Sequence, residues 1–335
     1  MLCITWNFGE NSEEVPDNIH ELIRRDIQHD LYVFSAQNCS NMTQLEKNIL
    51  DLIGNSYTVL AQESYRSLVL FFICRKKIKD LFNIEDIKID HYRDTNKTSK
   101  AVAIGLKIAE KNYAFVNCYI NPKSNSNYKV SDGEDVCLPK IVEIDQTLEL
   151  RPSGYEEQKL AVDSQQSNEK LSDLYDAWIF LGGFNTPIIG SATGVNSLIA
   201  SNMFEPLKKN DKMYLEFRNY AKTSLICNSS EFKKISYDEC LKFEQNSILN
   251  PYHEGEIMFA PTYCVIPFTD LYDTSYKSKD DVSYWGWTDR ILWTINQGKE
   301  MKKKQEFLKQ ISYDSNNLIK SSQNRPVFSQ FLINF

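Results

Sequence analysis

Apolar, strand-like runs at both ends of the chain limit the folds that it can adopt. One run begins almost at once, at residues 2–7 (LCITWN), and another closes the chain at 326–335. Between them, strand-like runs alternate with stretches of helical spacing, which is typical of α/β domains. We therefore expect one α/β domain over residues 1–335. Strands are predicted at 30–36, 57–61, 67–75, 101–108, 113–120, 176–181, 256–259, 283–287 and 290–295, helices at 17–28, 42–53 and 154–174, and a polar loop at 121–137.

The composition is that of an ordinary globular protein. Apolar residues make up 42% of the 335 residues and charged residues 25%, which argues against a disordered or low-complexity chain. Lys and Arg number 38 against 45 Asp and Glu, so the formal net charge is −7. We therefore expect no general electrostatic binding to nucleic acid. The basic run at 299–304 is interpreted as a solvated helix face.

The cysteines, the first residues and the apolar runs indicate the cellular compartment of the protein. None of the 8 cysteines forms a C-x-x-C pair, so they are predicted to be reduced core thiols rather than zinc ligands. The first residues, MLCITWNFGE, lack the pattern of a signal peptide. The longest apolar run, Leu68–Cys74, is too short to span a bilayer. These features predict a cytoplasmic protein without a transmembrane segment.

Short motifs lie at the ends of the predicted strands. Any one of them is weak, because short motifs occur by chance, but the complete set in a fixed order is much more specific. The motifs are T-W-N at 5–7, F-V-N-C at 115–118, L-G-G-F-N at 181–185, F-A-P-T-Y at 259–263, W-T-D-R-I-L at 287–292 and R-P-V at 325–327.

In this order and at these spacings, the motifs resemble those of the inositol polyphosphate 5-phosphatases, members of the endonuclease/exonuclease/phosphatase superfamily. The resemblance covers about residues 2–335. It implies a DNase I-like α/β fold of four layers, α/β/β/α, with two central sheets and helices outside. It also implies a Mg²⁺-dependent phosphoric monoester hydrolase, in which hard oxygen ligands hold the metal and a base activates water.

Several positions that carry this reaction in the family hold other residues here. Asn38 stands where a glutamate would bind Mg²⁺, and Tyr119 stands where a histidine would contact the scissile phosphate. Gly183 replaces the aspartate that orients or deprotonates the water. Gln323 and Asn324 replace a terminal Asp–His pair. The resemblance therefore implies that the charged and proton-handling groups are missing.

Two lysine positions of the family also differ. In the segment aligned through V-A-I at 102–104, Ser99 occupies the lysine slot and Lys100 is displaced by one residue. One step along a strand turns a side chain to the other face, so we expect Lys100 to point away from the site. After F-A-P-T-Y, Cys264 replaces a phosphate-binding lysine.

Other family positions are retained. Asn7, Asn185 and Asp289 remain from the catalytic set, and Tyr263, Arg290 and Arg325 are predicted to bind substrate. An internal ion pair between Asp289 and Arg290 is an equal alternative to ligand contact. Glu10 is considered as a substitute metal ligand and disfavoured, because it would lie in a loop beyond the strand end.

These substitutions predict a catalytically inactive 5-phosphatase-like protein. Removing one key catalytic group typically lowers a rate by about 10³–10⁶, so we expect no intact catalytic set, no Mg²⁺ binding and no cofactor. The predicted role is that of an interaction or scaffold protein (a pseudophosphatase) with a protein partner or a larger assembly. The alternatives are a weak binder of phosphoinositides or inositol phosphates, and a residual phosphatidylinositol phosphate 5-phosphatase.

Overall fold

The computed structural model describes residues 1–9, 15, 17–23, 27–95, 97, 99–120, 137–152, 174–218, 252–274, 285–296 and 307–334. Several predictions fall outside these ranges. They are the helix at 154–174 except for its last residue, the loop at 121–136, the basic run at 299–304, Glu10, Cys227 and Cys240.

The first sheet joins the two ends of the described chain. Its strand order is β11-β12-β1-β2-β4-β3, and β1 lies parallel to β2 and antiparallel to β12. Its central strands are apolar and buried on both faces, as expected for a sheet between two layers. The strands are β1 (Leu2–Asn7), β2 (Leu31–Gln37), β3 (Tyr57–Tyr65), β4 (Leu68–Arg75), β11 (Leu308–Ser315) and β12 (Val327–Ile333).

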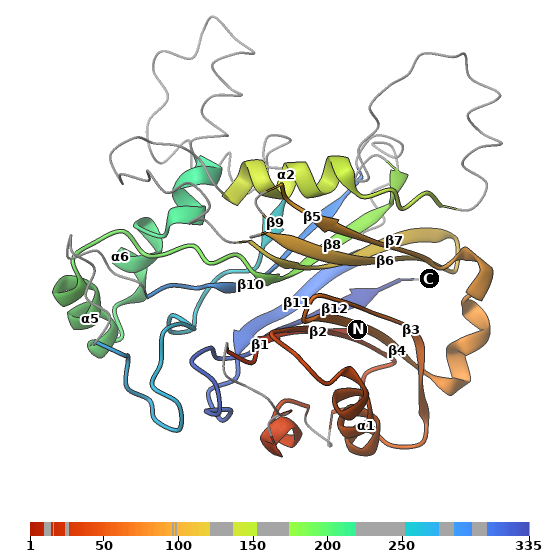
Figure 1. The fold of residues 1–335 in the computed structure, drawn as a ribbon, viewed down its shortest axis with the longest axis horizontal. Coiled ribbons are helices and arrows are strands. Elements are labelled where there is room, and N and C mark those ends of the chain that lie inside the picture. The colour runs from red at the N-terminus through yellow and green to blue at the C-terminus, as the bar shows by residue number, and fades with distance from the viewer. Residues whose placement is uncertain are drawn as a thin grey trace, which may run out of the picture.

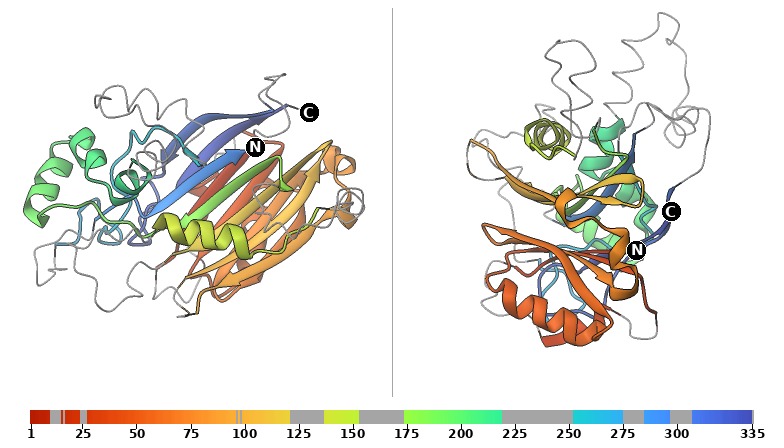
Figure 2. Two further views of the ribbon diagram at one scale, coloured as in Figure 1. Left: turned by 90° about the horizontal axis from the view of Figure 1, so that it is seen from above. Right: turned by 90° about the vertical axis from the view of Figure 1, so that its right-hand side faces the viewer.

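The second sheet stacks on the first, as Figures 1 and 2 show. Its order is β5-β6-β7-β8-β10-β9, with β7 and β8 parallel and the other neighbours antiparallel. The strands are β5 (Lys88–Arg93), β6 (Lys100–Ile108), β7 (Lys111–Tyr119), β8 (Ala177–Gly183), β9 (His253–Glu254) and β10 (Asp289–Ile295).

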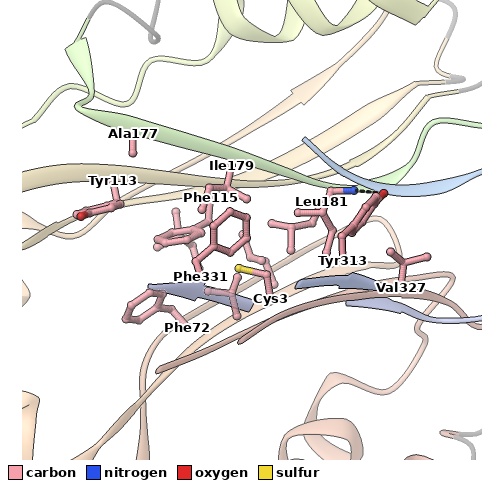
Figure 3. Packing of buried hydrophobic residues seen from close by; sticks show 14 of the residues in the cluster. Cys3, Phe72, Tyr113, Phe115, Ala177, Ile179, Leu181, Tyr313, Val327 and Phe331 are labelled. Carbon is pink, nitrogen blue, oxygen red and sulfur yellow. Dashed lines mark hydrogen bonds between the residues drawn. The ribbon is translucent and has the colours of Figure 1, made fainter. Parts of the chain in front are cut away.

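The main hydrophobic core lies between the two sheets. Alternate residues of each strand point inward, so Phe72 of β4 meets Phe115 of β7 with ring centroids 5.2 Å apart. Figure 3 shows this layer, with Leu181 and Tyr313 at the end where the strands reach the candidate site. This packing determines which residues of each strand face the other sheet.

Helices cover the outer face of each sheet. Helix α1 (Met42–Ile53) packs on the first sheet, begins at an Asn41 side-chain cap and ends at Gly54. Helix α2 (Cys137–Thr147) packs on the second sheet (Figure 1). This arrangement confirms the predicted α/β/β/α sandwich. Other described helices are α5 (Ala192–Ala200), α6 (Phe204–Lys209), a helical stretch at 212–218 and three 3₁₀ segments, Asp17–Glu21, Lys76–Leu81 and Ile84–Asp86.

The structure corrects several predicted elements. The helix predicted at 17–28 is only a 3₁₀ segment, Asp17–Glu21, in its described part. The strand predicted at 256–259 is not formed, and residues 285–288 are not a strand. Strands β5, β9 and β11 and helix α2 were not predicted, because polar residues interrupt their apolar pattern. Helices α5 and α6 lie in the region 188–250, where helical stretches were expected without defined bounds. No described helix has the length and apolar character needed to cross a membrane.

Candidate functional site

Asn7 and Asn38 meet where two parallel strands end. Asn7 closes β1, and Asn38 follows β2 with a φ of 56°. Asparagine tolerates this left-handed backbone better than most residues. The Asn38 Nδ2 donates a hydrogen bond of 2.8 Å to Asn7 Oδ1, and the Gly9 backbone N–H donates a second of 3.0 Å. The Asn7 side-chain oxygen is therefore already bound by two protein donors.

These residues do not fit a Mg²⁺ ion. Mg²⁺ is usually held by one or two carboxylates together with water and substrate oxygens. Here the two side chains at the strand ends are neutral amides that hydrogen bond to each other. Among the described residues, no group of three or more His, Cys, Asp or Glu side chains is arranged to hold a metal ion.

The segment 322–324 joins the ends of the two sheets. The Ser322 hydroxyl donates to the Asn7 carbonyl at 2.7 Å and accepts from the Asn324 backbone N–H at 3.1 Å. The Asn324 Nδ2 in turn donates to Asp289 Oδ2 at 2.7 Å and to Thr288 Oγ1 at 3.1 Å. A continuous chain of hydrogen bonds thus runs from Asn38 to Asp289. The backbone carbonyl of Gln323 makes a separate contact and accepts from the Val265 N–H at 3.0 Å.

Asp289 is a fully buried carboxyl group at the start of β10. Its Oδ2 accepts from Thr288 and Asn324, whereas its Oδ1 has no hydrogen-bond partner. Burial is the largest cause that raises the pKa of Asp289, to about 7, and the two hydrogen bonds lower it only in part. Since the charged form is costly in this place, a proton is held on Asp289 up to about neutral pH.

A pH-dependent loss of stability follows from Asp289. Its folded pKa of about 7 lies above the ordinary aspartate pKa of 3.8, so the folded state holds a proton that the unfolded state releases. This contribution to stability is complete below the unfolded pKa and is lost as the pH rises through the folded pKa. Asp289→Asn mimics the protonated group. Between about pH 5 and pH 8, wild type should lose on the order of 2 kcal/mol relative to this variant.

Urea unfolding of both proteins at the two pH values measures this difference, and other titrating groups cancel in the comparison. Equal changes in wild type and Asp289→Asn would show that Asp289 does not titrate in this range.

A lateral row of residues crosses the second sheet at this level. Asp289 is paired in register with Gly183, Gly183 with Tyr119, and Tyr119 with Lys100. Laterally paired residues share one face of a sheet, and here it is the face toward the first sheet. A Cβ atom built on Gly183 would lie 3.4 Å from Tyr119 Cδ2, so the position admits a Cβ atom in ordinary contact with that ring.

Lys100 is brought into this row, which corrects the expectation that its displacement turns it away. Ser99 precedes the strand and is fully buried, and its backbone N–H donates to Asp94 Oδ1 at 3.1 Å. The ammonium group of Lys100 lies 5.5 Å from the centre of the Tyr119 ring. The sequence aligned Ser99 with the lysine slot, but the sheet register places Lys100 on the site side.

Arg290 faces away from this row. It follows Asp289 on the strand, so its side chain lies on the outer face, where it is 1% exposed. Its Nη2 lies 2.5 Å from Asp211 Oδ1, and its Nη1 lies 3.0 Å from Glu254 Oε2. The structure therefore corrects two interpretations. Arg290 is not placed to bind a substrate beside Asn7, and it forms its ion pairs with Asp211 and Glu254 and not with Asp289.

The remaining predicted residues support the local backbone. Asn185, with φ 52°, donates from Nδ2 to the Ile120 carbonyl at 2.8 Å. Arg325 is 3% exposed, and its Nη2 donates to the Thr269 carbonyl and lies 3.8 Å from Asp270 Oδ1. Its role in substrate binding remains a prediction.

Tyr263 and Cys264 occupy the segment beside Arg325. Tyr263 is half-buried and packs against the inter-sheet core. Cys264 is buried, and burial raises the pKa of its thiol to about 11, so the group is a neutral thiol at physiological pH. The lysine slot therefore carries no charge. Binding of a ligand by Tyr263 also remains a prediction.

Sequence reasoning missed a buried amide network between the sheets. The Gln37 Nε2 donates to Asn117 Oδ1 at 2.8 Å, and the Asn117 Nδ2 donates to the Ala36 and Val69 carbonyls, each at 2.8 Å. Asn117 lies in the F-V-N-C motif, which was the available signal. Asp211, one ion-pair partner of Arg290, had no comparable signal because it lies 79 residues away in the sequence. Glu254, the other partner, opens the E-G-x-I segment at 254–257, which precedes F-A-P-T-Y and was the available signal.

Comparison with known proteins identifies the class. The family model described as endonuclease/exonuclease/phosphatase family 2 matches residues 4–233 and 215–330. The chain belongs to this family, which confirms the fold and the resemblance to inositol polyphosphate 5-phosphatases.

The relatives include both 5-phosphatases and a nitrophorin. Nitrophorin of Cimex lectularius is 22% identical over 98% of this chain and 89% of its own length. The human phosphatidylinositol polyphosphate 5-phosphatase type IV is 21% identical over 99% of this chain, which spans only 46% of that protein. A segment of Caenorhabditis elegans synaptojanin is 42% identical over 24% of this chain and 6% of its own length.

Solved structures agree in fold. The inositol polyphosphate 5-phosphatase domain of a synaptojanin, in complex with inositol (1,4)-bisphosphate and a calcium ion, matches with a TM-score of 0.65 and 17% identity, covering 98% of this chain and 83% of that one. A Cimex nitrophorin ferrous NO complex matches with a TM-score of 0.64 and 18% identity, covering 100% of this chain and 98% of that one.

Proposed function

We propose that this protein is a non-catalytic member of its family, a pseudophosphatase that acts through binding to other proteins. The observation that carries the proposal is the hydrogen bond between the Asn7 and Asn38 side chains. It places two neutral amides, bound to each other, where the resemblance implies a metal carboxylate. Gly183 and Asn324 likewise supply neither a base nor a cation to the reaction.

What remains of the motifs supports the fold more than the reaction. Trp287 is fully buried and its indole N–H donates to the Phe259 carbonyl at 3.0 Å, which ties two of the motifs together. The Asn324 Nδ2 donates a hydrogen bond to Asp289, whose hydrogen-bond partners are thus neutral side chains. The nitrophorin relative supports the view that a chain of this fold can serve a purpose other than phosphate hydrolysis.

Affinity purification at native expression, followed by mass spectrometry, tests the proposed role. We expect one or a few protein partners in near-stoichiometric amounts, retained when EDTA is present. An Arg290→Met bait, which should be strongly destabilised, serves as the control for proteins that bind any unfolded chain. Recovery of the same proteins with both baits, or of no stoichiometric partner, would contradict the proposal.

A further inference from the structure

Two neighbouring loops expose a cluster of large apolar side chains. These loops, residues 264–273 after F-A-P-T-Y and residues 316–325 between β11 and β12, form the loop pair. The exposed side chains are Ile266, Phe268 and Leu271 on the first loop and Leu318 on the second. The Phe268 N–H donates to the Lys320 carbonyl at 2.6 Å, so the loops lie side by side, and both project at the lower left of Figure 1. An exposed apolar cluster of this kind marks an interaction surface.

Hydrogen bonds hold the first loop in one conformation. The Ile266 N–H donates to the Leu271 carbonyl at 2.8 Å. The Thr269 hydroxyl donates to the Ile266 carbonyl at 2.8 Å and accepts from the Leu271 N–H at 3.1 Å. The Arg325 guanidinium donates to the Thr269 carbonyl from the second loop. Because the loop is already ordered, little conformational entropy is lost when it binds a partner.

Phe268 has a costly backbone conformation although its ring lies in solvent. Its φ is 64°, in the left-handed region, where a bulky residue is a clear outlier. The side chain is 78% exposed, so packing within this chain does not compensate for the backbone strain. Strain of this kind is concentrated at sites of function. An aromatic ring presented in this way is typical of the residues that dominate the binding energy of protein interfaces.

The charged side chains make the loop pair complementary to a second copy of itself. The Lys320 Nζ lies 2.6 Å from Asp270 Oδ2, and the Asp270 side chain is 70% exposed. A two-fold rotation about an axis between these residues brings Lys320 of each copy opposite Asp270 of the other. The chain has a net charge of −7, so two copies repel each other least through a face on which the acid has a cation beside it.

A lipid bilayer fits this surface less well than a second copy does. Basic residues beside an apolar loop strengthen its binding to anionic lipids. Here the two cations of the loop pair, Lys320 and Arg325, lie 2.6 Å and 3.8 Å from the Asp270 carboxylate. The exposed carboxylate would have to enter the lipid beside Phe268, and a charged side chain is costly to bury there.

We infer that the loop pair is the interface of a symmetric dimer, in which Phe268 of each copy packs against Leu271 and Leu318 of the other. The polar rim is supplied by Lys320 and Asp270, which pair across the two-fold axis. The occupant is a second copy of this chain, so the inference does not rest on the proposed function, in which the partner is another protein.

Sedimentation velocity tests the dimer with the purified full chain. At about 50 µM, wild type should sediment as a species of twice the 38.9 kDa of one chain. Phe268→Gly should raise the dissociation constant by about 100-fold or more, because each dimer contains the substituted residue twice. Glycine adopts a φ of 64° without steric cost, so this variant should keep the melting temperature that wild type has at a concentration where both are monomers.

Exchanging the two charges tests the two-fold arrangement. Lys320→Asp places acids opposite Asp270 and should weaken the dimer by at least about tenfold. Adding Asp270→Lys restores opposite charges across the axis and should return most of the lost affinity. A double variant as weak as Lys320→Asp alone would contradict the pairing of Lys320 with Asp270 between copies.

Ile84→Ser is the matched control for the apolar contacts. Ile84 is also an exposed apolar side chain, but its 3₁₀ segment, Ile84–Asp86, lies on the opposite side of the molecule in Figure 1, so the dimer should be unchanged. A monomeric wild type at about 50 µM, or an equal loss with Ile84→Ser, would overturn the interface. Phe268-dependent binding of a monomeric wild type to phosphatidylcholine vesicles would also overturn it, and would assign the loop pair to a membrane. Release of phosphate from a phosphoester would contradict only the proposed function.

Discussion

Replacing Arg290 by methionine is expected to destabilise the protein by about 3–5 kcal/mol, because it leaves the buried Asp211 and the mostly buried Glu254 without their cation. Arg290 is 1% exposed and Asp211 is 2% exposed, so water cannot take the place of the guanidinium. Burial raises the pKa of both Asp211 and Glu254, and Arg290 opposes this shift. Urea unfolding at neutral pH measures the change.

Arg75→Met is the matched control for Arg290→Met. Arg75 also pairs with an aspartate, Asp30, at 3.3 Å, but this pair lies at the surface, where the acid side chain is 54% exposed. We expect a cost of about 1 kcal/mol or less for this variant. A similar small cost for Arg290→Met would show that the Arg290–Asp211–Glu254 cluster does not stabilise the fold. In the triple variant with Asp211→Asn and Glu254→Gln, part of the lost stability should return.

Restoring two carboxylates is expected to create Mg²⁺ binding where wild type has none. Asn38→Glu and Gly183→Asp place acidic groups beside Asn7 and Asp289, and a Cβ atom at position 183 meets no atom closer than 3.4 Å. A residue other than Asn at the φ of 56° at Asn38 costs about 1–2 kcal/mol. Added Mg²⁺ should raise the melting temperature of the double variant by roughly 5 °C, reversibly with EDTA, and leave wild type unchanged.

The control for added charge is Lys47→Glu on α1. Lys47 is exposed, and its replacement changes the net charge by as much as the double variant does. If Mg²⁺ raised the melting temperature of Lys47→Glu equally, the effect would be one of nonspecific charge. If Mg²⁺ raised the melting temperature of wild type, the interpretation that Asn7 and Asn38 hold no metal ion would be wrong.

The fold was predictable because its central strands carry a clear pattern. The run at 68–75 is continuously apolar and is buried between two layers, and α1 has helical spacing with a cap at each end. Strand β5 escaped notice, because its burial alternates at a sheet edge and its residues include His91 and Arg93. Strand β11 is similarly polar on one face.

The site was predictable only where motifs marked it. The sequence indicated that Asn38, Gly183 and Asn324 would sit at strand ends, and the structure links Asn38 and Asn324 to Asn7 and Asp289 through hydrogen bonds. The face that each side chain takes was not predictable in this way. Lys100 lies on the site side, contrary to the expectation, and Arg290 lies on the outer face instead of at the site, because register is set by pairing with strands distant in sequence.

Release of phosphate by the purified protein is the measurement that bears most directly on the absence of catalysis. With a phosphoinositide substrate and Mg²⁺, we expect release at the rate of a buffer blank, while an active 5-phosphatase domain assayed in parallel turns over. Release well above the blank that EDTA abolishes, and that Asn7→Ala also abolishes, would contradict the account and show that the neutral side chains at the strand ends support the reaction.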